Sequence, residues 1–192
     1  MSQAKTFTSS ELEQVLSYAK TTKHAARNRA LLLITHWAGL RVGEVAALRL
    51  CDVCDEQLQV KSEIRLLPVQ TKGQHARTVF VNAKLRDELQ AYASTIHVRS
   101  PQQAFFYTQK HKTRGFTANT LTQHFKAMYV ASGIHGATSH SGRRSFITNL
   151  AAKGIGVRVL MSLAGHRNIS TTQAYIDVND DMKRRAVELV CS

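Results

Sequence analysis

The sequence predicts an α+β fold that is mostly α and forms one domain. Apolar residues recur every three or four positions through most of the chain, which is the period of a helix with one buried face. Alternation typical of strands is confined to residues 57–81, apart from a short apolar run at 104–107. No repeat, low-complexity segment or linker divides the 192 residues, so we expect residues 1–192 to form a single domain.

Three helices are expected after a start at residues 1–6 that we expect to be disordered. Ser10 and Glu13 have the spacing of a capping box, with Ser10 as the N-cap of the first helix. The second helix contains an apolar run at residues 31–34 and is apolar nearly all round, which indicates a central, buried position. The three predicted helices cover residues 10–20, 27–38 and 40–48.

A β-hairpin or small antiparallel sheet is predicted next, from strands at residues 57–61, 63–66 and 78–81. The turn before the last of these strands contains Lys72, flanked by Thr71 and Gly73. A lysine at a hairpin tip is commonly just solvated. A flexible basic tip is equally suited to enter a DNA groove.

The rest of the chain is predicted to be helical, with signals for each helix start. Asn82 caps a helix that runs through Ala93, and Thr117 starts another. Thr138 or Ser139 caps the helix that carries His140 and the residues after it. Two short helices are expected at residues 157–163 and 182–190, the last with one narrow apolar stripe.

The charge of the chain points to a polyanionic partner. Lys and Arg number 26 against 13 Asp and Glu, a net charge of +13. Because the basic residues are spread along the chain, we expect a folded basic face and not a flexible arm. A generally basic soluble protein is the plain alternative. No apolar run reaches the ~18 residues of a membrane span, so we expect no membrane partner and a cytoplasmic setting, close to the nucleoid.

The cysteines indicate a reducing compartment and no metal. There are three, at 51, 54 and 191, and an odd, small number is typical of intracellular proteins. Cys51 and Cys54 have C-x-x-C spacing, but no second pair exists to complete a zinc site. We expect structural thiols, and we interpret the acidic residues at 52, 55 and 56 as a solvated cluster.

Residues 164–175 place His166, several hydroxyls and Tyr175 in one short segment. A tyrosine hydroxyl has a pKa of about 10, so it is a poor nucleophile unless cations or a base assist it. Taken alone, Tyr175 is most simply a half-buried aromatic side chain. Basic residues that converge on a tyrosine suit attack on a phosphodiester, because fixed cations stabilise the charge of the transition state. The candidates upstream are Arg41, Lys72, His140 and Arg143.

Two of these arginines lie three residues from a second polar group. Arg41 and Glu44 share a helix face, either as a surface ion pair or with Glu44 orienting the guanidinium toward a phosphate. His140 and Arg143 share the first turn of a later helix, whose N-terminus attracts anions. A lone histidine at a helix start is most often a cap or a surface residue.

In this order the motifs resemble those of the tyrosine recombinases, the phage integrase family. The resemblance extends over residues 7 to about 190, and Gly142 stands where the family often has leucine. It implies a mostly α fold with a small three-stranded antiparallel sheet. The matching residues are Gly39-Leu40-Arg41-x-x-Glu44, Thr71-Lys72-Gly73, His140-x-x-Arg143, and Leu163-Ala164-Gly165-His166 followed by Thr171-Thr172 and Tyr175.

The resemblance implies an enzyme that cuts and rejoins DNA at specific sites, with no cofactor and no metal. Tyr175 would attack a phosphodiester, which gives a 3′-phosphotyrosyl link and a free 5′-hydroxyl. The other implied roles are phosphate binding by Arg41, Arg143 and His166, leaving-group protonation by Lys72, proton transfer at the tyrosine by His140, and support of Arg41 by Glu44. Further DNA contacts are expected from Arg77, Lys110, Lys112, Arg114, Arg144 and Arg167.

The expected partner is double-stranded DNA with inverted-repeat sites. The family usually carries an N-terminal DNA-clamping domain, so we expect either a naturally minimal recombinase or a fragment, from a prokaryote, phage or mobile element. We expect a monomer when free and a homotetramer on DNA, with a C-terminal helix at residues 178–190 exchanged between protomers. An accessory protein that bends or clamps DNA is a further expected partner.

Two other functions compete with recombination. A type IB topoisomerase uses similar arginine, lysine and tyrosine chemistry to relax DNA, but the apolar stripe after Tyr175 favours exchange between protomers. A non-catalytic DNA-binding regulator would be expected to have lost an active-site residue. All six implied catalytic residues are present.

Overall fold

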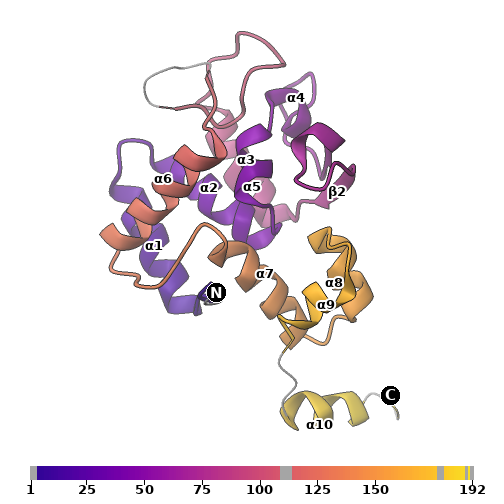
Figure 1. Cartoon of the computed structure of the whole chain (residues 1–192). Coiled ribbons are helices and arrows are strands. Elements are labelled where there is room, and N and C mark those ends of the chain that lie inside the picture. The colour runs from indigo at the N-terminus through magenta and orange to yellow at the C-terminus, as the bar shows by residue number, and fades with distance from the viewer. Residues whose placement is uncertain (1–3, 109–113, 177–179, 189, 191–192) are drawn as a thin grey trace.

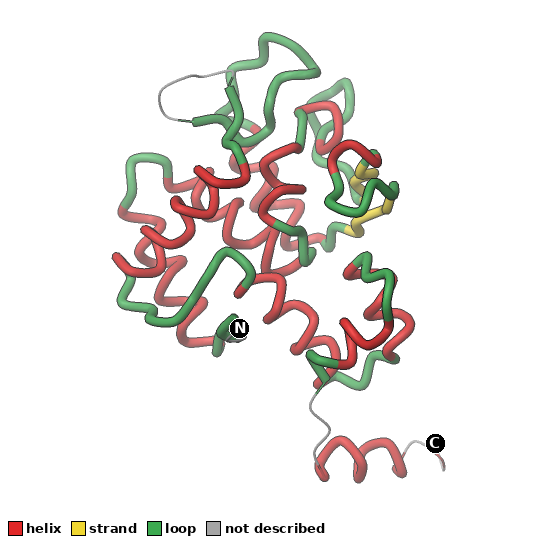
Figure 2. Tube along the Cα trace, viewed as in Figure 1, coloured by secondary structure: helices red, strands yellow, loops and turns green. Residues whose placement is uncertain are grey.

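The computed structural model describes residues 4–108, 114–176, 180–188 and 190, and it confirms a mostly helical fold with a small antiparallel sheet (Figures 1 and 2). No helix in these ranges is both long and apolar enough to cross a membrane. The described helices are α1 (Ser9–Thr21), α2 (Ala25–Trp37), α3 (Val42–Ala47), α4 (Leu50–Val53), α5 (Ala83–Ala93), α6 (Ala118–Ala131), α7 (Ser141–Ala152), α8 (Val157–Ala164), α9 (Ile169–Gln173) and α10 (Asp180–Glu188).

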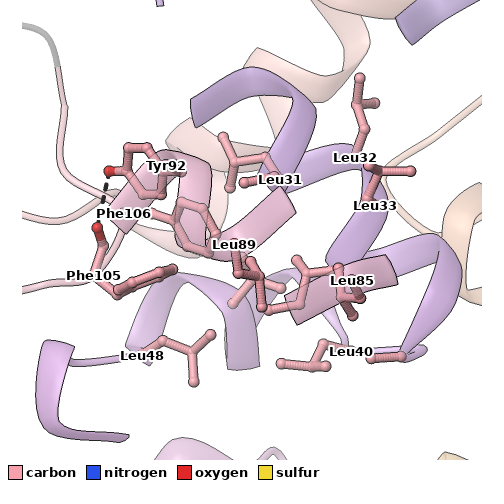
Figure 3. Close-up of a cluster of buried hydrophobic side chains, with 14 of the residues drawn as sticks. Leu31, Leu32, Leu33, Leu40, Leu48, Leu85, Leu89, Tyr92, Phe105 and Phe106 are labelled. Atoms are coloured by element: carbon pink, nitrogen blue, oxygen red, sulfur yellow. Dashed lines mark hydrogen bonds between the residues drawn. The ribbon is translucent and has the colours of Figure 1, made fainter. Parts of the chain in front are cut away.

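Helix α2 lies at the centre of the core, as its nearly uniform apolar sequence predicts. Leu31, Leu33 and Ile34 are fully buried, and α1, α5 and α7 pack around them. Figure 3 shows this cluster, in which the Tyr92 hydroxyl donates to the Phe105 carbonyl at 2.9 Å. The buried Tyr92 hydroxyl is therefore paired within the core.

Helix α7 approaches α2 closely because residue 142 is a glycine. A Cβ at Gly142 would lie 2.4 Å from Thr35 Oγ1, well inside contact distance. The close approach lets Arg143, one residue on, donate through Nη1 to the Gly39 carbonyl beyond the end of α2, at 2.6 Å. The glycine found in place of leucine thus has a packing role.

The first helix begins earlier than predicted. Thr8 is the N-cap, and it forms a capping box with Glu11 in place of the predicted box from Ser10 to Glu13. Both pairs have the right spacing, but Phe7 precedes Thr8 and is 5% exposed, so burial of Phe7 fixes the helix start. The start also has contacts where disorder was expected, since Thr6 accepts a hydrogen bond from Arg144 at 3.1 Å.

The sheet of the described residues has two strands, β1 (Glu63–Leu66) and β2 (Arg77–Phe80), and not three. Residues 57–61 were the expected third strand. The Asp55 carboxylate accepts from the backbone of Gln57 and of Gln59, and Leu58 has φ of 60°, so the segment turns around Asp55. It contributes one isolated bridge, between Cys54 and Val60. The predicted strand at 104–107 likewise forms only isolated bridges. A 3₁₀ turn, η1 (Pro68–Gln70), follows β1.

Helices α8 and α9 form a small unit beside the core, and α10 lies apart from it (Figure 1). Helix α8 packs against α7, α9 and β2. Helix α10 begins at Asp180, two residues before the start that the apolar pattern predicts and two after the start of the segment expected to be exchanged between protomers. Val187 in α10 is 68% exposed, whereas the Met182 and Leu189 side chains of the predicted stripe lie outside the described part of the chain.

Candidate active site

The C-terminal end of α8 is the point at which the arginines meet. The last carbonyls of a helix have no partner within the helix, and they carry its negative dipole end. Here three successive carbonyls, directly before His166, each accept a hydrogen bond from a different arginine side chain. The carbonyls of Leu163, Ala164 and Gly165 accept from Arg77 Nη1 at 2.9 Å, from Arg143 Nη2, and from Arg41 Nη2 at 3.1 Å.

One buried carboxylate joins two of these arginines. Glu44 is 1% exposed and accepts from Arg41 Nη1 at 3.0 Å and from Arg77 Nη2 at 2.7 Å. Burial raises the pKa of Glu44, but the hydrogen bonds and charges of Arg77 and Arg41 outweigh burial and leave it below its usual value. Glu44 is therefore an anion at neutral pH, and because it is buried its pair with Arg41 is not the surface ion pair that was one of the two expectations.

Arg143 is the most deeply placed cation of the site. Its side chain lies among buried residues at the start of α7, and burial is the main cause that lowers its pKa to about 9. The positive charge of Arg41 lowers this pKa further, while Glu44 opposes the shift. Arg143 still carries its charge at neutral pH, so it can stabilise negative charge that develops nearby.

His166 links the arginines to the tyrosine. Its Nδ1 lies 2.9 Å from Thr172 Oγ1 in α9, and its ring stacks on Tyr175 with centroids 5.8 Å apart. Burial, with the charges of Arg143 and Arg41, lowers the pKa of His166 to about 4. His166 is therefore a neutral imidazole that is held from two sides.

The Tyr175 ring also contacts Arg144. The guanidinium carbon of Arg144 lies 5.1 Å from the centroid of the tyrosine ring, in cation–π range. Tyr175 and Arg144 also line a hollow together with His140, Thr138 and Ser139. Burial and the charges of Arg143, Lys72 and Arg41 lower the pKa of His140, which favours its neutral form.

The start of α7 differs from the prediction. His140 itself is the N-cap, and neither Thr138 nor Ser139 caps the helix. The reason is a tight turn before the helix: the Thr138 amide donates to Ser141 Oγ at 2.9 Å, and the His140 amide donates to Thr138 Oγ1 at 3.2 Å. His140 thus stands at the helix entrance, on the side of the Tyr175 hollow.

Lys72 lies in a neighbouring cleft of about 530 Å³. It is exposed in the turn between η1 and β2, opposite the loop after α8. The cleft is also lined by Arg41, Arg77, His166 and Arg167. Lys72 is exposed in this cleft, whereas Arg41 and Arg77 are bound to Glu44.

Five of the six predicted residues line two hollows, which are linked by the contact of His166 with Tyr175. Arg41, Lys72 and His166 line one, and His140 and Tyr175 line the other. Arg143 lines neither, and it donates to the Ala164 carbonyl directly before the turn that carries His166. Among the expected DNA contacts, Arg167 lines the cleft and Arg144 contacts Tyr175. Arg114 is exposed but lines neither hollow, and Lys110 and Lys112 lie outside the described residues.

Sequence reasoning missed two members of the site. Arg77 was expected to contact DNA, yet it is bound to Glu44, from which it is 33 positions away in sequence. The Thr172 hydroxyl is hydrogen-bonded to the His166 ring, and the one sequence signal for this contact was a hydroxyl residue six positions after the histidine. Within the described part of the chain, no three His, Cys, Asp or Glu side chains are grouped as a metal site would need.

Comparison with known proteins agrees with this geometry. The sequence model of the phage integrase family matches residues 5–182. The tyrosine recombinase XerA of Pyrococcus horikoshii is 29% identical over 96% of this chain and 60% of its own length. The tyrosine recombinase XerD of Lacticaseibacillus casei is 31% identical over 91% of this chain and 59% of its own. The chain thus spans about three fifths of the length of these relatives.

Solved structures share the fold. A crystal structure of XerA recombinase superposes with a TM-score of 0.78 at 22% identity, and the match covers 98% of this chain and 64% of that one. The Tn1549 transposon integrase in complex with transposon right end DNA gives 0.77 at 19% identity, over 100% and 67% of the two chains. At these identities the structures support the fold alone.

Proposed function

The chain belongs to the phage integrase family, and from this premise we propose that it cuts and rejoins DNA at specific sites as a tyrosine recombinase. The nucleophile in this proposal is Tyr175. The observation that carries it is the contact of the Tyr175 ring with His166, whose loop is held by three arginines. No simple packing role for a tyrosine requires so many cations at one loop.

The proposed step exchanges one phosphoester for another. The Tyr175 oxygen attacks the phosphorus, the bond to the 5′-oxygen breaks, and the DNA is left with a 3′-phosphotyrosyl link and a free 5′-hydroxyl. The tyrosine proton leaves and the 5′-oxygen gains a proton, so charge and atoms balance. The same step in reverse, with a second 5′-hydroxyl, rejoins the DNA without an external energy source.

Two residues are suited to move these protons. His140 lines the same hollow as Tyr175 and has a lowered pKa, so at neutral pH it is a free base that can accept the tyrosine proton. Lys72 is exposed in the other hollow, and we assign it to the protonation of the 5′-oxygen. The acid and the base therefore approach the phosphate from different elements.

The remaining cations would bind the phosphate and its extra charge. Arg41 and Arg143 use two of their nitrogens on protein oxygens, which fixes the guanidinium planes before DNA arrives. Preorganised donors of this kind stabilise a transition state without reorganisation at the moment of reaction. His166 Nδ1 lies 2.9 Å from Thr172 Oγ1, and in the tautomer that accepts from this hydroxyl the Nε2–H of His166 is a further donor.

The proposed substrate sets the partners and the setting. A net charge of +13 suits duplex DNA, and recombination between two sites suits a homotetramer built on inverted repeats. We propose that the free protein is a monomer, that α10 docks on a neighbour within the tetramer, and that an accessory protein bends or clamps the DNA. Such a protein would act in the cytoplasm, at the nucleoid.

A covalent trap tests the proposal. The protein would be incubated with a randomised pool of nicked suicide duplexes, in which the short fragment that carries the free 5′-hydroxyl diffuses away. The adducts would be isolated after denaturation and sequenced. We expect a denaturation-resistant adduct on a narrow set of sequences. Tyr175→Phe should give none, because it lacks the attacking oxygen.

Tyr18→Phe is the matched control, since Tyr18 lies on α1 and lines neither hollow. It should form the adduct at the normal rate. An adduct with Tyr175→Phe would show that another group is the nucleophile, and absence of any adduct with the unaltered protein would remove the proposed activity.

A further inference from the structure

Arg77 is bound on all three of its nitrogens by the protein itself. Nε and Nη2 donate to the two oxygens of Glu44 at 3.2 and 2.7 Å, and Nη1 donates to the Leu163 carbonyl at 2.9 Å. Its side chain is 10% exposed, against 27% for Arg41 in the same cleft. The planar fork of Arg77 is therefore turned inward, toward protein oxygens, and not toward a phosphate.

The bidentate pair with Glu44 couples Arg77 to Arg41. Glu44 also accepts from the Arg41 backbone amide at 2.8 Å and from its Nη1 at 3.0 Å, so one buried carboxylate fixes two arginines. A buried anion that loses one partner carries an uncompensated charge and draws more strongly on the other. Loss of Arg77 would therefore change the placement of Arg41.

The turn that carries His166 rests on the stem of Arg77. Gly165 has a left-handed φ of 60°, and a Cβ there would lie 2.6 Å from Arg77 Cδ. The backbone of this turn is thus in direct contact with the aliphatic part of Arg77, while its guanidinium holds Leu163 two residues earlier. Arg77 supports the end of α8 both by packing and by hydrogen bonding.

We propose that Arg77 is a positioning residue that fixes Glu44 and the end of α8 relative to each other, so that Arg41 and His166 face the same phosphate. The inference rests on the proposed function. It assigns to Arg77 a role different from the DNA contact that its charge suggests, and it makes strand β2 part of the active-site framework.

Two measurements separate positioning from DNA contact. The first is the rate of adduct formation on the selected suicide duplex at saturating protein. The second is the slope of log affinity against log salt on an intact duplex. Arg77→Met should slow adduct formation by up to about 100-fold, because a misplacement of Arg41 and His166 by about 1 Å costs that much. The slope of log affinity against log salt should stay unchanged. Arg167→Ala is the comparison, because Arg167 is exposed in the same cleft, and it should lower the slope by about 1.

A coupling test excludes a general loss of structure. The Glu44→Gln variant already lacks the carboxylate that binds the Arg77 guanidinium. Adding Arg77→Met to that variant should therefore slow adduct formation little further. Arg77→Lys keeps the charge but not the fork, and we expect it to restore only a small part of the rate. A spectroscopic signature accompanies these rates, because Arg77 is one of the charges that lower the pKa of His166. NMR titration of the His166 ring should show a higher pKa in Arg77→Met and a smaller rise in Arg77→Lys.

The outcomes are distinct. A lower salt slope in Arg77→Met with a normal rate at saturation would make Arg77 a phosphate contact and overturn the inference. The inference would also be overturned if the rate losses of Glu44→Gln and Arg77→Met multiply when the two are combined and the pKa of His166 is unchanged in Arg77→Met. If Arg77→Met does not fold, Arg77→Lys carries the same comparisons. Failure of the unaltered protein to form an adduct would remove the proposed function, and the NMR titration would then decide the placement of Arg77 alone.

Discussion

Lys72 differs from Arg41 and Arg77 in the same cleft because it is exposed, whereas both arginines are bound to Glu44. If it protonates the 5′-oxygen, Lys72→Ala should cleave DNA at least about 100-fold more slowly, as general acids contribute that much or more. The same variant should recover on DNA with sulfur at the bridging 5′ position, because a thiolate leaves without a proton. Rates of adduct formation on the two substrates measure this.

Lys84→Ala is the control for charge alone, since Lys84 is exposed in the first turn of α5 and does not line the cleft. It should cleave both substrates at the normal rates. A Lys72→Ala variant that sulfur fails to rescue would place Lys72 in binding or in structure, and not in proton transfer.

His36 makes the stability of the fold depend on pH. It is 6% exposed with its Nδ1 unpartnered among the described residues, and burial lowers its pKa from 6.5 to about 4. The unfolded chain therefore binds a proton that the folded chain excludes, so stability is lost as pH falls from about 6.5 to about 4. His124 and His166 have pKa values lowered to about 4 and act in the same direction.

The melting temperature measured between pH 7 and pH 4 tests this. His36→Phe keeps a ring against Phe7 but cannot titrate, so its melting temperature should fall less steeply than that of the unaltered protein. His97→Gln, at an exposed position, should keep the original slope. Equal slopes for His36→Phe and the unaltered protein would show that His36 is already protonated in the fold.

At the scale of elements, the contact of α7 with α2 is the most sensitive to one added methyl group. Gly142→Ala would place a Cβ 2.4 Å from Thr35 Oγ1 and 3.0 Å from Thr35 Cβ. Overpacking of this kind costs about 1–3 kcal/mol of unfolding free energy. It should also slow adduct formation, because Arg143 is the next residue of the displaced turn. Denaturant unfolding and the covalent trap measure the two effects.

Gly43→Ala is the matched control within a helix. Its added Cβ would lie 3.9 Å from Ala118, which is ordinary contact, so the substitution should be neutral or stabilise by up to about 1 kcal/mol. Thr35→Ala combined with Gly142→Ala should regain part of the lost stability. Equal stabilities for Gly43→Ala and Gly142→Ala would contradict the packing role of Gly142.

The elements that the sequence predicts well are those whose signals are local. Helix α5 lies where Asn82 and the apolar positions after it predict, with the Asn82 side chain accepting from the Leu85 amide at 2.9 Å. The expected strand at 57–61 fails because alternation describes side chains only. The hydrogen bonds of Asp55 decide the backbone there, and sequence pattern does not reveal which amides a carboxylate will bind.

The same distinction holds for the site. Spacing pairs Arg41 with Glu44, and both hydrogen bonds of that pair are present. No local pattern joins Arg77 to Glu44 or three arginines to the end of α8, because these contacts link segments far apart in the chain. The charge and residue types of the site are thus predictable, while the order in which its groups support one another is not.

At the scale of the whole molecule, α10 lies apart from the α8–α9 unit and the core (Figure 1). Val187 in α10 and Val190, two residues after its end, are 68% and 81% exposed. If α10 docks on a neighbour, deletion of residues 182–192 should abolish strand exchange and DNA-bound tetramers, while binding to a single site stays close to normal. Recombination of two-site DNA and sedimentation of the complexes measure this. Deletion of residues 191–192 alone is the control, and normal recombination by the longer truncation would exclude a coupling role for α10.

The weak burial of the α8–α9 unit has a consequence for the order in which heating removes activity and helical structure. Few of its side chains are deeply buried, among them Leu160, Ala164 and Thr172, and it carries His166 and Tyr175. Local openings cost less than global unfolding where little apolar surface is buried, so this unit can detach while the α2 core persists. Catalytic competence would then vanish at temperatures at which most of the helix content remains. We therefore expect thermal inactivation and thermal denaturation of this protein to be two separate events.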